Sequence, residues 1–321
     1  MKVKMKMIDP EFRGITLAIR LLSPFTGNFI SAFDRVRKNR QMLNKGVKAN
    51  TQLNKENVFI ARSDGSKLRL LVLTSGKASG SKPEILWLHG GGYGLGTPEQ
   101  DIAFIERFIA KRDAFCVVPE YTLSIDKPYP AALEDAYLSL RWLKQNASRY
   151  GAKENQIFIG GDSGGGGLAL ALALYARDKA EIKIAFMMPL YPMIDDTLST
   201  PSMKDNNAPV WDCKQNKFAW QMYLGELFGK ENIPYTAAPF RAADLHGLPP
   251  AVSYVGSLDP FRDETAYFMN RLKDAGIETS FEIFEGVFHA FDIGRPNSKK
   301  GSAAISFLLE RYLHACDHYS T

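Results

Sequence analysis

Residues 157–165 read Ile-Phe-Ile-Gly-Gly-Asp-Ser-Gly-Gly, and they carry the most specific structural signal in the chain. Its apolar beginning predicts a buried strand, and the leucine- and alanine-rich residues 168–176 predict a helix after it. The pattern Gly161-x-Ser163-x-Gly165 lies between the two, which is the context that a nucleophilic serine on a sharp strand-to-helix turn requires. Small residues on either side let the backbone turn sharply, so we expect the hydroxyl of Ser163 to be exposed at the turn.

Other interpretations exist for a glycine-rich turn between a strand and a helix. A phosphate-binding Walker loop is excluded because no Lys-Ser or Lys-Thr pair follows the glycines. Gly164-x-Gly166-x-x-Ala169 matches a dinucleotide-binding fingerprint only weakly, since it starts inside the predicted helix. A plain glycine-rich turn is the structural alternative to the nucleophile.

On either side of this turn, short apolar runs alternate with longer amphipathic ones. Six short runs from residue 85 onward predict strands, and a hairpin signal around Ser63-Asp64-Gly65-Ser66 adds two more. The alternation predicts an α/β fold with an eight-stranded, mostly parallel sheet that has helices on both faces. The predicted strands are 58–62, 68–73, 85–88, 115–118, 157–159, 182–188, 251–255 and 280–284, and the predicted helices are 99–111, 131–149, 164–177, 262–275 and 301–314.

A second glycine-rich run, His89-Gly90-Gly91-Gly92, directly follows the predicted strand 85–88. Consecutive glycines let backbone N–H groups converge on one point with no side chain in the way, which a developing oxyanion needs. We interpret this run as an oxyanion loop, with a flexible turn as the structural alternative. Its presence upstream of the G-x-S-x-G pattern favours acyl-transfer chemistry.

A serine nucleophile needs a histidine base, and in this architecture the chain order is serine, carboxylate, histidine. His289 fits, because it lies on the loop after the predicted strand 280–284, at the carboxyl edge of the sheet. A purely structural histidine is the alternative. Position excludes the other histidines: His89 belongs to the oxyanion loop, His246 precedes a strand, and His314 and His318 lie close to the C-terminal residue.

The orienting carboxylate is expected on the loop that follows strand 251–255. Asp259 lies on that loop. Asp263 and Glu264 fall in the first turn of the next predicted helix, where acidic side chains commonly stabilise the helix dipole. We choose Asp259 as the acid and keep Asp263 as the alternative.

Charge is distributed unevenly along the 321 residues. The chain has 40 Lys+Arg against 35 Asp+Glu, and its net charge of +5 is too small for an electrostatic nucleic-acid binder. Residues 1–50 hold 11 Lys or Arg against 3 Asp or Glu, a local surplus of +8. Apolar positions at helical spacing over 11–43, interrupted at Ser23-Pro24, predict two amphipathic helices there.

The cysteines and the N-terminal residues suggest a compartment. Cys116, Cys213 and Cys316 form no C-x-x-C motif and no even framework, which favours a reducing, cytoplasmic environment and argues against a thiolate metal site. The charged N-terminal stretch has no apolar signal region behind it, and no run is long enough to span a membrane. We therefore expect a cytoplasmic protein without stable membrane insertion.

Four motifs in this order and spacing resemble the hormone-sensitive-lipase family of α/β hydrolases. They are His-Gly-Gly-Gly at 89–92, Gly-Asp-Ser-Gly-Gly at 161–165, Asp-Pro-Phe-Arg-Asp-Glu at 259–264 and Phe-His-Ala-Phe at 288–291, within a resemblance that covers roughly 56–315. The resemblance implies an α/β-hydrolase fold. It implies a triad of Ser163, Asp259 and His289, an oxyanion hole of the Gly91, Gly92 and Gly164 N–H groups, and motif-supporting roles for His89, Gly90, Gly161 and Gly165.

The resemblance also implies a helical cap made of two separate segments. Residues 1–50 and about 195–240 occupy the places where the family carries its cap, and 51–321 would form the catalytic domain. The alternative for the basic N-terminal segment is attachment to anionic lipid. We favour the cap.

The chain departs from the family pattern at three places. Gly164 stands where the family usually has alanine, and Ala290 where it usually has glycine. The family's Tyr-Arg-Leu-Ala-Pro-Glu run is replaced by Tyr-Thr-Leu-Ser-Ile-Asp at 121–126, so the packing of that loop does not carry over. None of these residues is a reacting group.

These observations predict a serine carboxylesterase that hydrolyses short- to medium-chain esters through an acyl-enzyme. We expect small-molecule ester substrates, no metal or organic cofactor, no nucleic-acid partner and a possible homodimer. The main alternative is a homologue of the same fold that binds a small ligand without hydrolysing it. A dinucleotide-dependent oxidoreductase and a peptidase are weaker alternatives.

Overall fold

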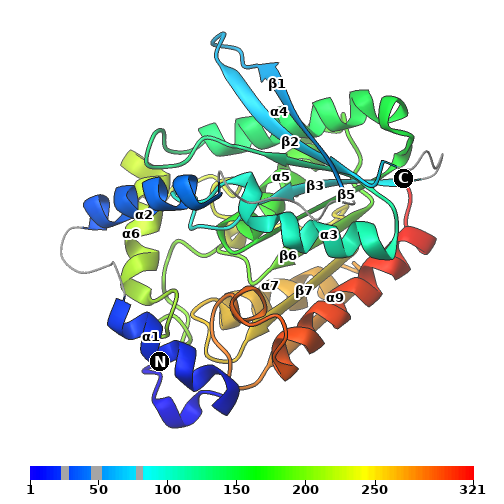
Figure 1. Ribbon diagram of the computed structural model, residues 1–321. Helices are drawn as coiled ribbons and strands as arrows, with labels where there is room; N and C mark the ends of the chain where they lie inside the picture. The colour runs from blue at the N-terminus through cyan, green and yellow to red at the C-terminus, as the bar shows by residue number, and fades with distance from the viewer. Residues whose placement is uncertain (23–28, 45–52, 77–81) are drawn as a thin grey trace.

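The predicted strands form one sheet in the computed structural model, which describes residues 1–22, 29–44, 53–76 and 82–321. The strand order is β1-β2-β4-β3-β5-β6-β7-β8 (Figure 1). Strand β2 pairs antiparallel with β1 and β4, and the other pairings are parallel, which confirms the predicted topology. The strands are β1 (Asn54–Ala61), β2 (Lys67–Thr74), β3 (Lys82–Leu88), β4 (Phe115–Pro119), β5 (Ala152–Asp162), β6 (Phe186–Leu190), β7 (Ala251–Gly256) and β8 (Thr279–Phe284).

Two hydrophobic clusters lie on opposite faces of this sheet. Side chains alternate along a strand, so in β2 Leu70 and Val72 join one cluster while Leu71 and Leu73 join the other. The first cluster contains residues of α4 (Ala131–Asn146), α5 (Gly164–Lys179) and α7 (Arg262–Asp274), and the second contains residues of α3 (Ile102–Lys111) and α9 (Lys299–His318). The remaining short helices are η1 (Met5–Met7), η2 (Pro98–Asp101), η3 (Ser148–Tyr150), η4 (Gly225–Leu227), η5 (Pro239–Arg241) and α8 (Phe291–Gly294).

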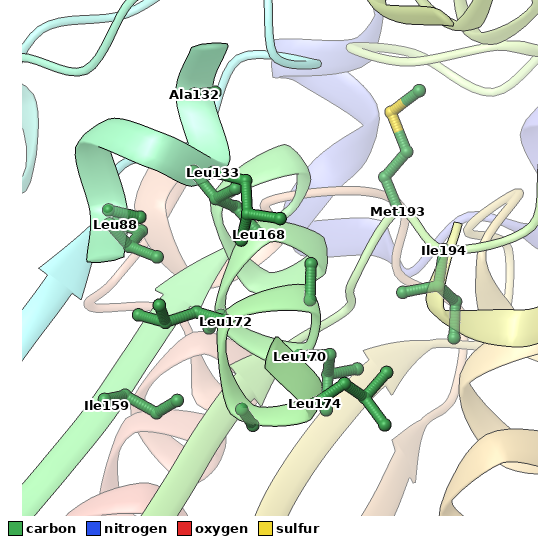
Figure 2. Packing of buried hydrophobic residues seen from close by; sticks show 14 of the residues in the cluster. Leu88, Ala132, Leu133, Ile159, Leu168, Leu170, Leu172, Leu174, Met193 and Ile194 are labelled. Carbon is green, nitrogen blue, oxygen red and sulfur yellow. The ribbon is translucent and has the colours of Figure 1, made fainter. Parts of the chain in front are cut away.

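Helix α5 is buried on nearly every side, and its N-terminus follows Ser163 directly. Its four leucines, Leu168, Leu170, Leu172 and Leu174, are all buried, and Figure 2 shows them among Leu88 of β3, Leu133 of α4 and Ile159 of β5. A helix that is apolar all round belongs in a core. Truncating one such leucine to alanine costs about 2–5 kcal/mol, so this packing fixes the helix beneath Ser163 firmly.

Strand β6 begins four residues later than the predicted run 182–188 and ends at Leu190. The reason lies at the end of α5, where Ala180 adopts a left-handed conformation with φ 54° and closes the helix. The chain then needs several residues to cross from the helix to the sheet. The first ordered contact with β5 is the bond from Ala185 N–H to the Ile157 carbonyl, at 2.8 Å.

Three helices from distant parts of the sequence gather beside the sheet. They are α1 (Pro10–Leu22), α2 (Phe29–Asn44) and α6 (Cys213–Leu224), and Figure 1 shows them on one side of the molecule. Phe12 of α1 packs edge-on to Phe288, and Phe33 of α2 packs against Trp211 and Phe218. The predicted break at Ser23-Pro24 lies outside the described residues. Across the described ranges, none of the helices combines the length and the apolar character that crossing a bilayer requires.

Candidate active site

Ser163 lies at the turn between β5 and α5 with φ 56° and ψ −121°, a conformation that side-chain-bearing residues rarely adopt. Its N–H donates to the Leu190 carbonyl at 3.0 Å, and its own carbonyl accepts from the N–H groups of Gly167 and Met193 at 3.0 Å each. The end of β6, the loop after it and the first turn of α5 therefore hold the strained turn in place. We expected an exposed hydroxyl; instead the residue is only 4% exposed, because it lines a pocket.

The glycine at 165 is required by the end of β3. A Cβ atom on Gly165 would lie 2.0 Å from the Leu88 carbonyl oxygen, and one on Gly161 would lie 2.3 Å from the same oxygen. Both distances are far inside van der Waals contact. The two glycines let β3 and the loop after it run directly against the serine turn.

His289 connects Ser163 to a buried carboxylate. Its Nε2 lies 2.8 Å from the Ser163 Oγ, and its Nδ1 lies 2.8 Å from the Asp259 Oδ2. The other oxygen of Asp259 accepts the Phe261 N–H at 2.9 Å, and Asp259 has no exposed surface. Because an ionised carboxylate only accepts hydrogen bonds, Nδ1 carries the proton and Nε2 is left to accept the serine hydroxyl.

Aromatic rings hold the imidazole in this orientation. The rings of Tyr191 and Phe261 meet it edge-on, each with its centroid 5.1 Å away. Trp211 is tilted toward it at 6.4 Å. The histidine is 3% exposed, so its position is set by packing as well as by its two hydrogen bonds.

The alternative carboxylate, Asp263, is engaged elsewhere. Its Oδ1 accepts from Arg262 Nε at 2.7 Å and its Oδ2 from the Ser202 N–H at 2.7 Å. Burial alone would raise the pKa of Asp263, but these hydrogen bonds hold it below the usual value. The neighbouring Glu264 is fully buried and accepts the Ile194 N–H at 2.8 Å, so it anchors the loop after β6 as well as lying in the first turn of α7.

The glycine run after β3 lies against the serine turn. The Gly90 N–H donates to Asp162 Oδ1 at 2.9 Å, and the Gly91 carbonyl accepts from the N–H groups of Gly94 and Leu95. Gly92 has φ 57°, and a Cβ there would lie 2.4 Å from the Trp211 ring. A Cβ on Gly164 would lie 2.9 Å from the Gly92 nitrogen, so the backbones of these two residues are immediate neighbours.

His89 packs within the oxyanion loop and supports it. Its ring stacks on Tyr121 with centroids 4.2 Å apart, and its Nδ1 lies 3.0 Å from the Gly90 carbonyl. The Tyr121 hydroxyl donates to the His89 carbonyl at 2.7 Å. Tyr121 begins the stretch that departs from the family pattern, and its ring still packs on this loop. The remaining histidines, His246, His314 and His318, form exposed or partly exposed contacts elsewhere.

Asp162 belongs to the site, although the sequence reasoning assigned it no role. Burial raises its pKa to about 6, and the negative charge of Asp292 adds to the shift, while His289 and a hydrogen bond with Asp101 oppose it. It holds the Gly90 N–H next to the serine turn. In the sequence, the feature that could have pointed to Asp162 is its place at the end of a buried strand, directly before the candidate nucleophile.

A pocket of about 680 Å³ opens onto Ser163 and His289. Its wall is mostly apolar, and Trp211 forms part of it. Besides the serine turn, η2 and residues 289–293, the segments that line it are α1, α2, the loop after β3, the loop leading into α6 and the first turn of α6. They contribute Ala18, Ile19, Arg20, Val36, Gly90, Gly91, Leu95, Ala208, Pro209, Val210, Trp211 and Gln215. No local pattern in the sequence indicates that Val36 and Trp211 share one wall.

The site also bears on the predicted absence of a metal. Within the parts of the chain that the structure describes, no three His, Cys, Asp or Glu side chains converge as a metal site would need. The absence of a cofactor stays a prediction.

The chain is similar to a known protein family and to several known esterases. A family model described as alpha/beta hydrolase fold matches residues 85–293. Esterase LipI of Mycobacterium tuberculosis is 33% identical over 65% of this chain and 65% of its own length, so the match spans just under two thirds of that relative. Carboxylesterase NlhH of the same species is 30% identical over 73% of this chain and 75% of its length.

The solved structures agree with the sequence relatives. One described as a bacterial heroin esterase is 26% identical, covers 98% of this chain and 99% of its own, and superposes with a TM-score of 0.89. An esterase from Pyrobaculum calidifontis is also 26% identical, covers 95% of this chain and 98% of its own, and has a TM-score of 0.81.

Proposed function

Because the chain belongs to the α/β-hydrolase fold family, in the hormone-sensitive-lipase-like group of carboxylic-ester hydrolases, we propose that it cleaves short- to medium-chain esters through an acyl-enzyme on Ser163. One observation carries this proposal. The Ser163 Oγ, the His289 imidazole and the Asp259 carboxylate form a continuous hydrogen-bonded chain with two distances of 2.8 Å, and Ser163 and His289 line a pocket.

In the first half-reaction, the Ser163 Oγ forms a bond to the ester carbonyl carbon while its proton passes to His289 Nε2. Throughout, His289 Nδ1–H donates a hydrogen bond to Asp259, whose negative charge stabilises the imidazolium. The carbonyl oxygen becomes an oxyanion, which we assign to the N–H groups of Gly91, Gly92 and Gly164. When the C–O bond to the alcohol breaks, His289 returns its proton to the leaving oxygen.

In the second half-reaction, water takes the place of the alcohol. His289 removes a proton from the water as it attacks the acyl carbon, and then protonates the Ser163 Oγ as the carboxylic acid leaves. Every proton transfer uses the same nitrogen. The chemistry needs no group beyond the side chains and N–H groups of the chain.

The pocket supports an assignment of substrate size and a role for the two cap segments. A volume of about 680 Å³ with a mostly apolar wall fits a compact acyl or alcohol group. Residues of α1, α2 and the loop before α6 form part of that wall, so we assign cap roles to residues 1–50 and about 195–240. The remainder of 51–321 is then the catalytic domain.

The test is hydrolysis of a series of p-nitrophenyl esters of increasing acyl length by the wild type and by Ser163→Ala. We expect wild-type kcat/KM to be highest for short to medium chains and the variant to lose nearly all activity. A fluorophosphonate reagent should add one phosphonyl group to Ser163, detected by peptide mass, and His289→Ala should slow that labelling. Undiminished hydrolysis by Ser163→Ala would refute the proposal.

A further inference from the structure

The mouth of the active-site pocket carries exposed apolar side chains. Val210, in the loop before α6, is 38% exposed, and Ile293, in α8, is 41% exposed. Both also line the pocket that contains Ser163, as does Ala18 of α1. Apolar surface at the rim of a catalytic pocket is therefore continuous with the wall inside it.

Helix α1 extends this apolar surface outward. Its buried side carries Phe12 and Thr16, yet its opposite side is also apolar. Gly14, Leu17, Ala18 and Leu21 follow the spacing i, i+3, i+4, i+7 and form one stripe, which we call the α1 stripe. Leu17 is 54% exposed and Leu21 is 84% exposed.

Basic side chains flank the α1 stripe. Arg13 and Arg20 lie along one border of it and donate to the Ile8 and Val3 carbonyls, which hold the guanidinium groups beside the helix. The N-terminal segment adds Lys2, Lys4 and Lys6, all exposed. Residues 1–22 thus hold five basic residues against Asp9 and Glu11, a surplus of +3.

The N-terminal segment is tied to the pocket mouth. The Val3 N–H donates to Asn207 Oδ1 at 2.6 Å, and Asn207 lines the pocket. The lysines on either side of Val3 therefore lie near the same opening as the α1 stripe. The exposed lysines of the N-terminal segment and the exposed leucines of the α1 stripe therefore lie in one region, beside the pocket mouth.

From this arrangement we propose that the α1 stripe and the pocket mouth dock onto an anionic lipid surface, from which an ester enters the pocket directly. An apolar helix face bordered by Lys and Arg is the pattern of helices that lie in a membrane interface. A protein seated over the mouth would close the route to Ser163, whereas a lipid surface can supply the ester itself. The inference rests on the proposed function and specifies where that function's substrate is presented.

The test measures binding without hydrolysis. The full chain carrying Ser163→Ala is sedimented with vesicles of phosphatidylcholine alone and of phosphatidylcholine mixed with phosphatidylglycerol. We expect binding to the mixed vesicles and little to the neutral ones, with the difference lost at high salt. Adding Leu17→Ser and Leu21→Ser should lower the partition coefficient on mixed vesicles by at least about tenfold, since each buried leucine contributes strongly to transfer from water.

Two further variants separate the apolar and charged contributions. Phe59→Ser removes an apolar side chain that is 58% exposed on β1, at the opposite end of the molecule from α1 (Figure 1), and should leave binding unchanged. Replacing Lys2, Lys4 and Lys6 with glutamine should lower binding by at least about tenfold. All these substitutions are at exposed positions, and circular dichroism checks that the variants stay folded.

Several outcomes overturn the proposal: equal binding to neutral and anionic vesicles, unchanged binding of the double serine variant, or an equal loss with Phe59→Ser. A dimer that depends on Leu17 and Leu21, with no vesicle binding, would show that a second copy covers the stripe. Ester hydrolysis by the wild type without vesicle binding overturns the docking alone. Vesicle binding without any ester hydrolysis overturns the proposed function alone.

Discussion

Glu84 is a fully buried carboxyl group in β3, and replacing it with glutamine should change how stability depends on pH. Among the described residues, neither of its side-chain oxygens has a hydrogen-bond partner. Burial raises its pKa from 4.5 to about 8, and the charge of Glu154 adds to this while Lys144 opposes it. Glutamine keeps the shape of the side chain and does not titrate.

The size of the effect follows from the pKa in the two states. Folding raises the pKa of the Glu84 carboxyl group from 4.5 to about 8, so the folded state binds its proton more tightly than the unfolded state does. The resulting contribution to stability is complete below pH 4.5 and is lost as the pH rises through about 8. At about 1.4 kcal/mol for each tenfold change in proton affinity, the loss is about 5 kcal/mol at most. The wild type should lose this much unfolding free energy between about pH 4.5 and pH 8, and Glu84→Gln should not.

Urea unfolding followed by tryptophan fluorescence measures the difference. The free energy of unfolding is determined for both proteins at mildly acidic and at alkaline pH, and the change in the wild type is compared with that in Glu84→Gln. Other titrating groups cancel in the comparison. Glu310→Gln, at an exposed position of α9, is the control and should follow the wild type. Parallel pH curves for the wild type and Glu84→Gln would refute the reasoning.

Four further substitutions test the site and the packing around it. Asp259→Asn should lower kcat for p-nitrophenyl esters by about 10⁴, while Asp263→Asn should change it by less than about tenfold; equal losses would contradict the choice of Asp259. Gly165→Ala should lower kcat by at least about tenfold, because the new Cβ would lie 2.0 Å from the Leu88 carbonyl oxygen and 2.5 Å from the His89 carbonyl oxygen and displace the oxyanion loop; unchanged kcat would mean that the loop has room. The fully buried Asp292 accepts hydrogen bonds from the hydroxyls of Tyr254 at 2.6 Å and Tyr191 at 3.0 Å. Asp292→Asn should therefore lower the free energy of unfolding, measured in urea, by about 1–3 kcal/mol. An unchanged urea midpoint would argue against a stabilising role for these two bonds.

Much of the fold can be predicted from the sequence because its signals are local. Alternating apolar runs specify strands and helices within a few residues of chain, and β-α alternation then leaves few topologies. The candidate residues Ser163, Asp259 and His289 could be selected because each follows a predicted strand. The carboxyl ends of parallel strands lie at the same edge of a sheet, so a parallel sheet brings the loops that follow these strands close together.

Boundaries and turn contacts were less predictable. The start of β6 depends on how α5 ends at Ala180, which the apolar run 182–188 does not reveal. The link from Asp162 to the Gly90 N–H depends on β3 and β5 being neighbours in the sheet. The sequence around Asp162 does not indicate which backbone N–H group its carboxylate binds, because that group lies on a neighbouring strand's loop.

Spacing and residue type along the chain are enough to predict the sheet, the strand-to-helix turn at Ser163 and the short set of candidate site residues. The pocket depends on how distant segments pack together. The tertiary structure places Val36 of α2 and Trp211 before α6 on one wall, and it leaves Leu17 and Leu21 of α1 exposed. Such contacts join segments far apart in the chain, and packing across the sheet selects them, so no local pattern encodes them.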